Sequence, residues 1–380
     1  IFPHAIPGCF PHMEIFYNFA EPAVSFPALS NRCVFKQIFG ISMKSVLSVP
    51  SFLIAIFAWG ALSCSSTKDD IRVVPDSKLL KLMIGTSSFE NDAVTAVMRN
   101  DSIVPDLLML NSPAHSIAKV HSWIWVVCEG YVRVVKPSDY STLGTIAHMS
   151  EDLDFQYIVP VKSGQVAVSD AALGAVFLVD EKDFKITKEI LFNRPVGQMI
   201  VTGSKLYAAA GDRICAFQLD KTYQTSELEI PARPDSKLVS DKFGALWALS
   251  ADYLYCVSDT TMAAHYSLSA LGIDASEGYL EIDSERDEMY FNALKNGKLS
   301  VFEITVGDEK GRIELNPTPL FTLDAVEDMT GMVMSPRNTL YIGDAKSGTG
   351  SGVVYEYDLY GRILNTYAVN GTPGALFADR

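Results

Sequence analysis

The sequence predicts an all-β protein, a seven-bladed β-propeller built from four-stranded antiparallel blades. Short runs of Val, Ile, Phe and Tyr alternate with Gly, Ser and Asp, which is the pattern of strands and tight turns. From Leu79 onward, units of roughly 35–50 residues follow one another, a period typical of propellers and solenoids. The units lack the 3.6-residue periodicity that a helical solenoid requires.

The first 63 residues are predicted to lie outside the folded domain. Residues 1–42 show no periodicity and end just before Met43, so we interpret them as an upstream extension that is absent from the mature protein. Residues 43–63 begin with Met-Lys, continue with a largely apolar run and end in small residues, as a signal peptide does. The alternative is a retained membrane anchor, because the run approaches spanning length.

Cys64 is the predicted lipidation site. Ala61-Leu62-Ser63-Cys64 resembles the bacterial lipobox, although Leu-Ala is the usual order before the serine. Residues 64–78 are a polar tether, in which Lys68-Asp69-Asp70 resembles the export signal of surface lipoproteins of the Bacteroidetes. We therefore expect an outer-membrane lipoprotein, held by its lipid anchor at the cell surface or on the periplasmic face.

Residues 79–380 are assigned to the propeller. In the third unit, the four expected strands are Tyr157–Val161, Gln165–Ser169, Ala175–Val179 and Phe184–Leu191. The second unit (Ser116–Ala147) and the fourth to seventh repeat this pattern, and the sixth carries an insertion at 307–319. The first unit, Leu79–Leu110, lacks an inner strand, whereas Gly374–Ala378 resembles an inner strand without a blade. We expect these two to pair and close the ring, since closure removes exposed sheet edges. Six or eight blades remain the alternatives.

Composition limits the functional classes. The chain contains 48% hydrophobic and 20% charged residues, which is typical of a folded protein with a core. Its net charge of -14 argues against a nucleic-acid-binding surface, which needs a basic patch. The six cysteines form no CxxC pair, and Cys128, Cys215 and Cys256 lie in apolar runs, so we predict buried free thiols.

Three stretches carry a resemblance to a known family: Leu110–Ile146, Phe155–Ile190 and Tyr341–Phe377. The pattern they share is an apolar inner strand, a lone turn and a Val-Asp-x-x-x-Phe exit, which is residues 179–184 in the second stretch, while Gly-x-Pro-Gly precedes the final strand. The pattern resembles the YncE-like propellers, and most closely the DUF5074-type propeller lipoproteins of gut Bacteroidetes. The resemblance implies a possible role in capturing cobalamin for a TonB-dependent outer-membrane transporter. The first unit departs from the family pattern, so the ligand is not carried over.

The candidate ligand-binding residues are expected in loops on one face. In a propeller, the loops that enter each inner strand and the loops from second to third strands share a face, and loops on a rigid scaffold carry function. Aromatic side chains there can stack on a planar or sugar-like ligand, and Arg194 and Arg233 can bind carboxylate or phosphate. The predicted residues are Phe89, Glu90, Asn91, Glu129, Asp154, Phe155, Asp170, Arg194, Asp212, Arg213, Arg233, Tyr253, Tyr279, Lys295, Asp344 and Lys346.

Catalytic motifs are missing from the sequence. Neither a Gly-x-Ser-x-Gly elbow nor an HExxH motif occurs, and His115, His121, His148 and His265 belong to different repeats. We therefore expect a monomeric, non-catalytic binding protein without cofactor or metal, whose partner is a small molecule or an outer-membrane transporter. One alternative is a propeller enzyme, such as a metal-dependent lactonase with Asp154, Asp170, Asp212 and Asp344 at the axis, or a glycan-processing enzyme. Another alternative is a protein–protein interaction scaffold.

Overall fold

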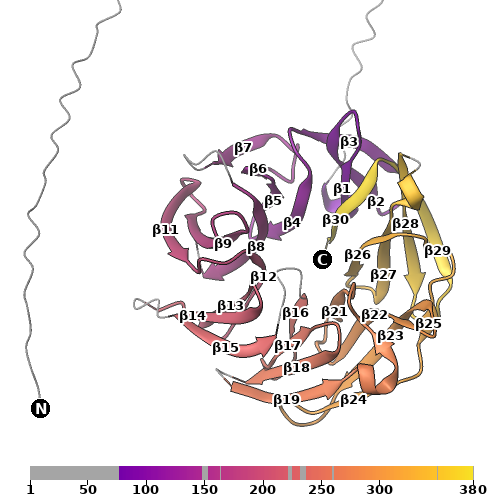
Figure 1. Cartoon of the computed structure of the whole chain (residues 1–380). Coiled ribbons are helices and arrows are strands. Elements are labelled where there is room, and N and C mark those ends of the chain that lie inside the picture. The colour runs from indigo at the N-terminus through magenta and orange to yellow at the C-terminus, as the bar shows by residue number, and fades with distance from the viewer. Residues whose placement is uncertain are drawn as a thin grey trace, which may run out of the picture. The chain divides into compact units, whose positions relative to one another are not determined.

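The computed structural model describes residues 77–147, 153–162, 164–220, 225–231, 237–258, 261–348 and 350–379. These residues form seven antiparallel sheets arranged as a ring, so the predicted seven-bladed β-propeller is confirmed (Figure 1). The predicted extension, the signal peptide, Cys64 and all of the tether except its last two residues lie outside the described residues, as do His148 and Arg233. No helix among the described residues is long and apolar enough to cross a membrane.

The first five blades follow the predicted units in chain order. Blade 1 contains η1 (Ser77–Leu79), β1 (Leu80–Ser87), β2 (Asp92–Met98) and β3 (Ile103–Leu110). Blade 2 contains β4 (Ala114–Val120), β5 (Trp123–Cys128), β6 (Tyr131–Val135) and β7 (Thr142–Ile146). Blade 3 contains β8 (Phe155–Lys162), β9 (Gln165–Asp170), β10 (Ala175–Asp180) and β11 (Lys185–Leu191). Blade 4 contains β12 (Val196–Thr202), β13 (Lys205–Ala210), β14 (Arg213–Gln218) and β15 (Thr225–Pro231). Blade 5 contains β16 (Lys237–Ser240), β17 (Leu246–Leu249), β18 (Tyr253–Ser258), β19 (Thr261–Ser267) and the turn η2 (Ser269–Leu271).

The sixth blade is the least regular of the seven. It contains β20 (Ile273–Asp274), β21 (Leu280–Ile282), β22 (Glu288–Lys295), β23 (Lys298–Val306), β24 (Ile313–Leu315) and β25 (Phe321–Thr322). Both β24 and β25 pair with β23, so the predicted insertion divides the outer strand into two short pieces. Blade 7 contains β26 (Met329–Met334), β27 (Thr339–Asp344), η3 (Lys346–Gly348), β28 (Ser351–Asp358) and β29 (Ile363–Asn370).

The last strand closes the ring as the sequence predicts. β30 (Thr372–Ala378) pairs with β1 as the innermost strand of blade 1, for example Met83 with Phe377 (Figure 1). The chain reverses into β30 at Gly371, whose φ is +86°, a conformation that glycine adopts without steric cost. Each innermost strand then packs against the next around the axis, in the order β30, β4, β8, β12, β16, β21 and β26.

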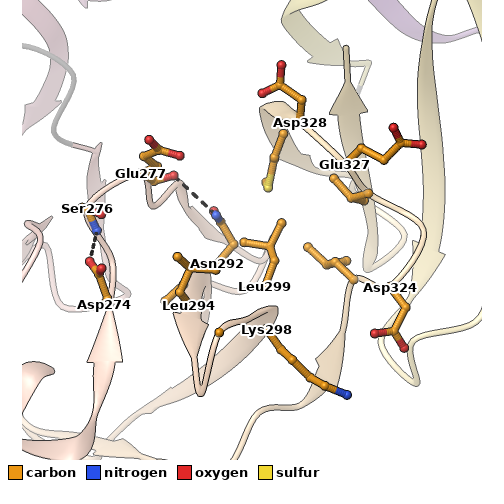
Figure 2. A pocket seen from close by; sticks show the side chains of 15 residues that line it. Asp274, Ser276, Glu277, Asn292, Leu294, Lys298, Leu299, Asp324, Glu327 and Asp328 are labelled. Carbon is orange, nitrogen blue, oxygen red and sulfur yellow. Dashed lines mark hydrogen bonds between the residues drawn. The ribbon is translucent and has the colours of Figure 1, made fainter. Parts of the chain in front are cut away.

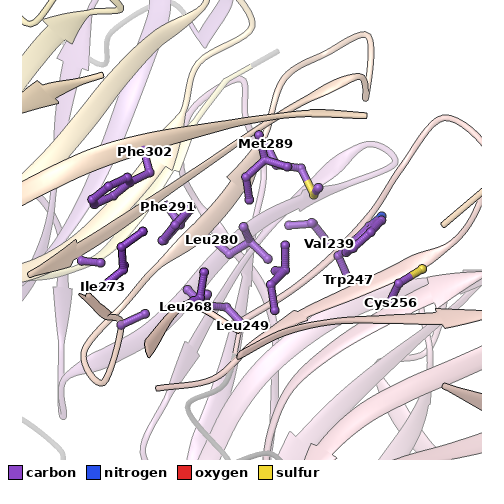
Figure 3. Close-up of a cluster of buried hydrophobic side chains, with 14 of the residues drawn as sticks. Val239, Trp247, Leu249, Cys256, Leu268, Ile273, Leu280, Met289, Phe291 and Phe302 are labelled. Atoms are coloured by element: carbon purple, nitrogen blue, oxygen red, sulfur yellow. The ribbon is translucent and has the colours of Figure 1, made fainter. Parts of the chain in front are cut away.

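The core lies between the blades. Seven clusters of buried apolar side chains occur among the described residues, one at each junction of neighbouring blades. Figure 3 shows the cluster between blades 5 and 6, which includes Trp247, Leu280 and Phe291. Burying one such side chain contributes roughly 2 kcal/mol. This packing explains the sequence pattern: a middle strand such as β10 is covered on both faces and is apolar up to its last residue, whereas the outer strand β11 alternates.

A network of ionised and phenolic groups crosses the junction of blades 7 and 1. The Lys81 ammonium on β1 lies 2.6 Å from Asp101 Oδ1 and 2.7 Å from Glu356 Oε2 on β28. The Tyr367 hydroxyl on β29 lies within 2.9 Å of both carboxylates, and Tyr341 donates to Glu356 Oε1. The network therefore adds charged contacts to the strand pairing that closes the ring.

Candidate functional site

The loops that the sequence assigned to one face do lie at the same end of the blades. Within each regular blade, the second-to-third-strand loop and the segment entering the innermost strand are at one end of the antiparallel sheet. We call this end the top face. Its loops include 88–91 in blade 1, 171–174 in blade 3, and 275–279 and 323–328 before β21 and β26.

Three adjoining cavities lie in this part of the molecule, two of them over blades 5 to 7 and the third on the ring axis. The outer cavity has a volume of about 400 Å³ and lies between blades 6 and 7, where Asn292, Lys298 and Asp324 line it (Figure 2). The rim cavity, about 340 Å³, shares Ser276, Glu277, Asp328 and Met329 with the outer cavity. The axial cavity, about 240 Å³, lies between the innermost strands and shares Lys237 and Tyr279 with the rim cavity. Their volumes suit small organic ligands.

Lys237 lies where the rim cavity meets the axial cavity. It is the first residue of β16, and its ammonium donates to the Tyr157 hydroxyl at 3.1 Å. The same nitrogen lies 4.7 Å from the centre of the Tyr279 ring and 5.6 Å from that of Tyr157. Tyr279 is held in turn by its hydroxyl, which donates to the Thr330 carbonyl. Two aromatic rings from blades 3 and 6 thus position a positive charge at the entrance to the axis.

Glu277 and Asp328 line both the outer and the rim cavity. Within the described residues, neither carboxylate takes part in an ion pair or a hydrogen bond. Figure 2 shows the two carboxylates on opposite sides of the outer cavity, and both point away from the Lys298 ammonium. They therefore present negative charge that none of the described residues pairs with.

His115 brings a third chemical group to the axial cavity. Its Nδ1 lies 2.7 Å from the Phe155 carbonyl oxygen and 3.5 Å from Asp154 Oδ1. The Gln156 amide nitrogen lies 3.1 Å from the same Nδ1, so whether Nδ1 donates to the carbonyl or accepts from the amide depends on the tautomer of the ring. Gln156 donates to Asp154 at 2.6 Å, which orients the carboxylate beside the ring.

Three of the predicted ligand-binding residues, Phe155, Asp170 and Asp344, are buried and have structural partners. Phe155 is fully buried and packs edge-to-face on Phe177 in the core. Asp170, at the end of β9, accepts the backbone N–H groups of Asp154 and Leu173, and burial raises the pKa of its carboxyl group. These carboxylate and ring atoms face the protein interior and do not meet the three cavities.

Asp344 has the same role at the end of β27 in blade 7. It accepts the backbone N–H groups of Glu327 and Asp328 and lies 2.9 Å from the Lys346 ammonium. Burial by itself would raise the pKa of Asp344, but the hydrogen bonds from Asp328 and Lys346 outweigh it and lower the pKa. Lys346 also pairs with Glu327 at 3.0 Å, so both predicted residues hold the loop that lines the outer cavity.

Most of the remaining predicted residues lie on the top face but away from these cavities. Arg194 and Arg213 pair with Asp212 and Glu227 in blade 4, so their charges are compensated within the protein. Phe89, Glu90 and Asn91 line a separate cavity of about 350 Å³ at the junction of blades 7 and 1, where the Phe89 side chain is fully exposed. Glu129 lies in the loop between β5 and β6, Tyr253 begins β18 and Lys295 ends β22, and none of the three lines the adjoining cavities.

Among the predicted residues that the structure describes, only Tyr279 lines the rim and axial cavities. Lys237 was not among the predicted residues. A lysine at the start of an otherwise buried inner strand could have indicated a binding residue at the axis. Glu277 and Asp328 belong to the predicted loops, yet nothing in their sequence context separates them from ordinary turn residues.

The turn aspartates considered for an axial metal do not gather there. Asp170 and Asp344 are buried in their own loops, while the Asp212 side chain is 77% exposed and pairs with two arginines. Among the described residues, no three His, Cys, Asp or Glu side chains are placed to hold a metal ion.

Comparison with known proteins identifies the fold and no closer relationship. No family model matches the chain, and no curated protein matches it. A quinonprotein alcohol dehydrogenase-like protein of Bacteroides thetaiotaomicron superposes with a TM-score of 0.63 at 10% identity, covering 78% of each chain. A candidate 6-phosphogluconolactonase of Bacteroides fragilis gives 0.60 at 12% identity and covers 79% of this chain and 98% of its own. The propeller domain of Cps50 (Swd1) from Myceliophteria thermophila gives 0.55 at 11% identity over 70% and 90%. At these identities the likeness shows the propeller fold alone.

Proposed function

We propose that this chain is a non-catalytic binding protein of the cell envelope, which captures a small polar ligand in the rim cavity of the top face. The observation that carries the proposal is the position of Lys237, which the Tyr157 and Tyr279 rings hold between two cavities of ligand size. Preformed, concave sites with a few convergent polar groups are typical of small-molecule binding. The signal peptide and the lipobox-like sequence ending in Cys64 support the cell-envelope location.

A thermal-shift screen tests the ligand-binding part. The panel contains corrinoids, glycans, calcium and small zwitterions, and at least one class is expected to raise Tm. Ser276 is exposed and lines both the outer and the rim cavity. Ser276→Trp should therefore abolish that shift, because the indole ring would occupy the space of the ligand. The matched control is Ser284→Trp, in the turn between β21 and β22 at the opposite end of blade 6. A shift that survives Ser276→Trp would place the ligand elsewhere.

The proposal that the ligand is a corrinoid is more specific, and the same thermal-shift screen tests it separately. A corrinoid is larger than any one of the three cavities, so only part of it would enter, and the rest would lie across the top-face loops. The absence of a shift with every corrinoid in the panel would remove this version and leave capture of a smaller ligand in place.

Docking on an outer-membrane transporter is the other part of the proposal. The fully exposed Phe89 on the top face supports it, because exposed aromatic side chains are frequent anchors in protein interfaces. Phe89→Ala should weaken co-purification with a TonB-dependent transporter from cell envelopes, whereas Tyr360→Ala, at the opposite end of blade 7, should not. Equal recovery with both variants would argue against Phe89 as the contact.

Lipid anchoring is tested with Cys64→Ser. Loss of the thiol should abolish incorporation of radiolabelled palmitate and move the protein from the membrane fraction to the soluble fraction. Retention of the variant in the membrane fraction would instead support the apolar run as a membrane anchor.

Lactone hydrolysis is a second candidate, favoured by the carboxylate and amide side chains that line the outer cavity together. The carboxylates of Glu277 and Asp328 and the nearby Asn292 are the groups that would serve it. Turnover of sugar lactones with added divalent cations, lost in Glu277→Gln, would support the enzyme and overturn the non-catalytic proposal.

A further inference from the structure

We infer that the ligand of the rim cavity is a zwitterion, a small molecule with one anionic and one cationic group at separate ends. This inference rests on the proposed function and specifies its ligand class. It depends on the arrangement of charges around one cavity: a lysine on the axial side, and two carboxylates on the side shared with the outer cavity.

The anionic end is assigned to the axial side. The Lys237 ammonium faces both the rim and the axial cavity, and the rings of Tyr157 and Tyr279 limit where it can move. A lysine held in this way places its ammonium group at the cavity wall, where it also donates to the Tyr157 hydroxyl. A ligand carboxylate placed beside it gains a charged hydrogen bond.

The cationic end is assigned to the opposite side. Glu277 and Asp328 line the rim cavity together, and within the described part of the chain neither has an internal partner. A bound ammonium or guanidinium group on this side would be attracted by both carboxylates and could pair with either of them. Three other acidic residues of this region already have partners: Glu327 pairs with Lys346, Asp324 accepts the Thr322 hydroxyl, and Glu281 in the axial cavity accepts the Met334 N–H.

A purely anionic or purely cationic ligand fits less well. An anion that fills the rim cavity would bring negative charge against Glu277 and Asp328, and a cation would approach Lys237. Repulsion between like charges lowers the affinity for such a ligand, and a protein can use this repulsion to select among ligands. Only a molecule that carries both charges satisfies both sides of the same cavity.

Matched peptide probes test this inference by isothermal titration calorimetry at low ionic strength, where exposed charges are least screened. The probes are glycine peptides of increasing length, each also in its N-acetylated form, which is only anionic, and its C-amidated form, which is only cationic. At the best length, the free peptide should bind about tenfold more tightly than either blocked form. Equal binding of all three forms would overturn the inference.

Variants show which side of the rim cavity binds the carboxylate of the ligand and which side binds its amine. Lys237→Met should remove the preference for a free carboxylate, Lys237→Arg should retain it, and Glu277→Gln with Asp328→Asn should remove the preference for a free amine. The control Lys298→Met changes a residue of the outer cavity only, so it should leave all affinities unchanged. Unchanged preferences in the first and third variants would contradict the assignment.

The two proposals fail in distinguishable ways. If no zwitterionic probe binds but a neutral or singly charged compound gives a thermal shift that Ser276→Trp abolishes, the binding function stands and the zwitterion inference is wrong. If neither the peptides nor the screening panel bind the top face, the binding function itself is wrong.

Discussion

Single buried carboxylates organise the loops of the top face. Asp170 and Asp344 each end the second strand of a blade and accept N–H groups from the segment that enters the innermost strand. In blade 6, Asn292 takes this place and accepts the Tyr279 N–H at 2.7 Å. Asp170 and Asp344, which the sequence suggested as ligand-binding residues, therefore hold the backbone of the loops that enter the innermost strands. Other residues of these loops line the cavities.

Asp344→Ala should destabilise the protein by roughly 3 kcal/mol, because it leaves two buried N–H groups and the Lys346 ammonium without their acceptor. Urea denaturation followed by tryptophan fluorescence measures the loss. The comparison is Glu309→Ala, which breaks the exposed pair with Arg312 and should cost less than about 1 kcal/mol. Equal midpoints for the two variants would contradict this role of Asp344.

The three described cysteines should be unreactive in the native state. Cys128, Cys215 and Cys256 are buried, and burial raises the pKa values of their thiols to about 11, 11 and 12. The thiolate is the nucleophile, so alkylation by N-ethylmaleimide at neutral pH should require unfolding. Mass spectrometry of the labelled peptides, with and without urea, distinguishes these thiols from the others. Rapid labelling of any of the three in native protein would contradict the burial.

At the scale of elements, the junction of blades 7 and 1 should be sensitive to acid. Burial favours a raised pKa for Glu356, but hydrogen bonds from Lys81, Asn365 and Tyr367 outweigh it and lower the pKa below its ordinary 4.5. The Lys81 hydrogen bond also lowers the pKa of Asp101. A depressed folded-state pKa contributes stability at neutral pH that is lost as the pH falls below the unfolded-state value.

Glu356→Gln should therefore lower the free energy of unfolding at neutral pH by roughly 3 kcal/mol, because Lys81 loses a buried partner. The difference from the natural protein should shrink as the pH falls through 4.5 and below, where Glu356 becomes protonated in both folded and unfolded chains. Urea midpoints measured from neutral pH into the acid range test this. A difference that stays constant with pH would show that the charge of Glu356 is not the cause.

Regular strands could be predicted from the sequence, and irregular ones could not. In blade 3, alternating and continuous apolar runs place all four strands to within about two residues, because their burial follows the period of the strand. In blade 6, β20 and β25 are two residues long, too short to show any period. The split outer strand therefore appeared in the sequence as an insertion.

At the scale of the whole molecule, the sequence indicates the face that carries the site but not the site itself. The order of strands in each blade decides which loops lie together, so the top face could be predicted from the repeat alone. Which residues converge depends on how blades 3, 5 and 6 meet at the axis, since Tyr157, Lys237 and Tyr279 come from innermost strands or the loop entering one. A single sequence contains no periodic signal for such contacts between distant repeats.

Removal of residues 371–380 should prevent the ring from closing. β1 would lose its partner and expose an unpaired edge, which favours aggregation. We expect the truncated chain to unfold at lower urea concentration and to elute as oligomers in size-exclusion chromatography. Addition of a synthetic peptide of residues 371–380 should restore the monomer, whereas a scrambled peptide should not. A truncated chain that stays monomeric and equally stable would show that closure by β30 is dispensable.

The pairing of β1 with β30 also sets a limit on when this protein can fold. The two strands lie at opposite ends of the propeller sequence, so blade 1 leaves the ribosome with three strands and waits for its fourth until β30 has been synthesised. At roughly 5–20 residues per second, this wait lasts many seconds, during which the edge of β1 is open to other chains. Completion of the ring therefore has to follow synthesis of all seven blades, and for a chain that is exported it would fall to the compartment that receives it.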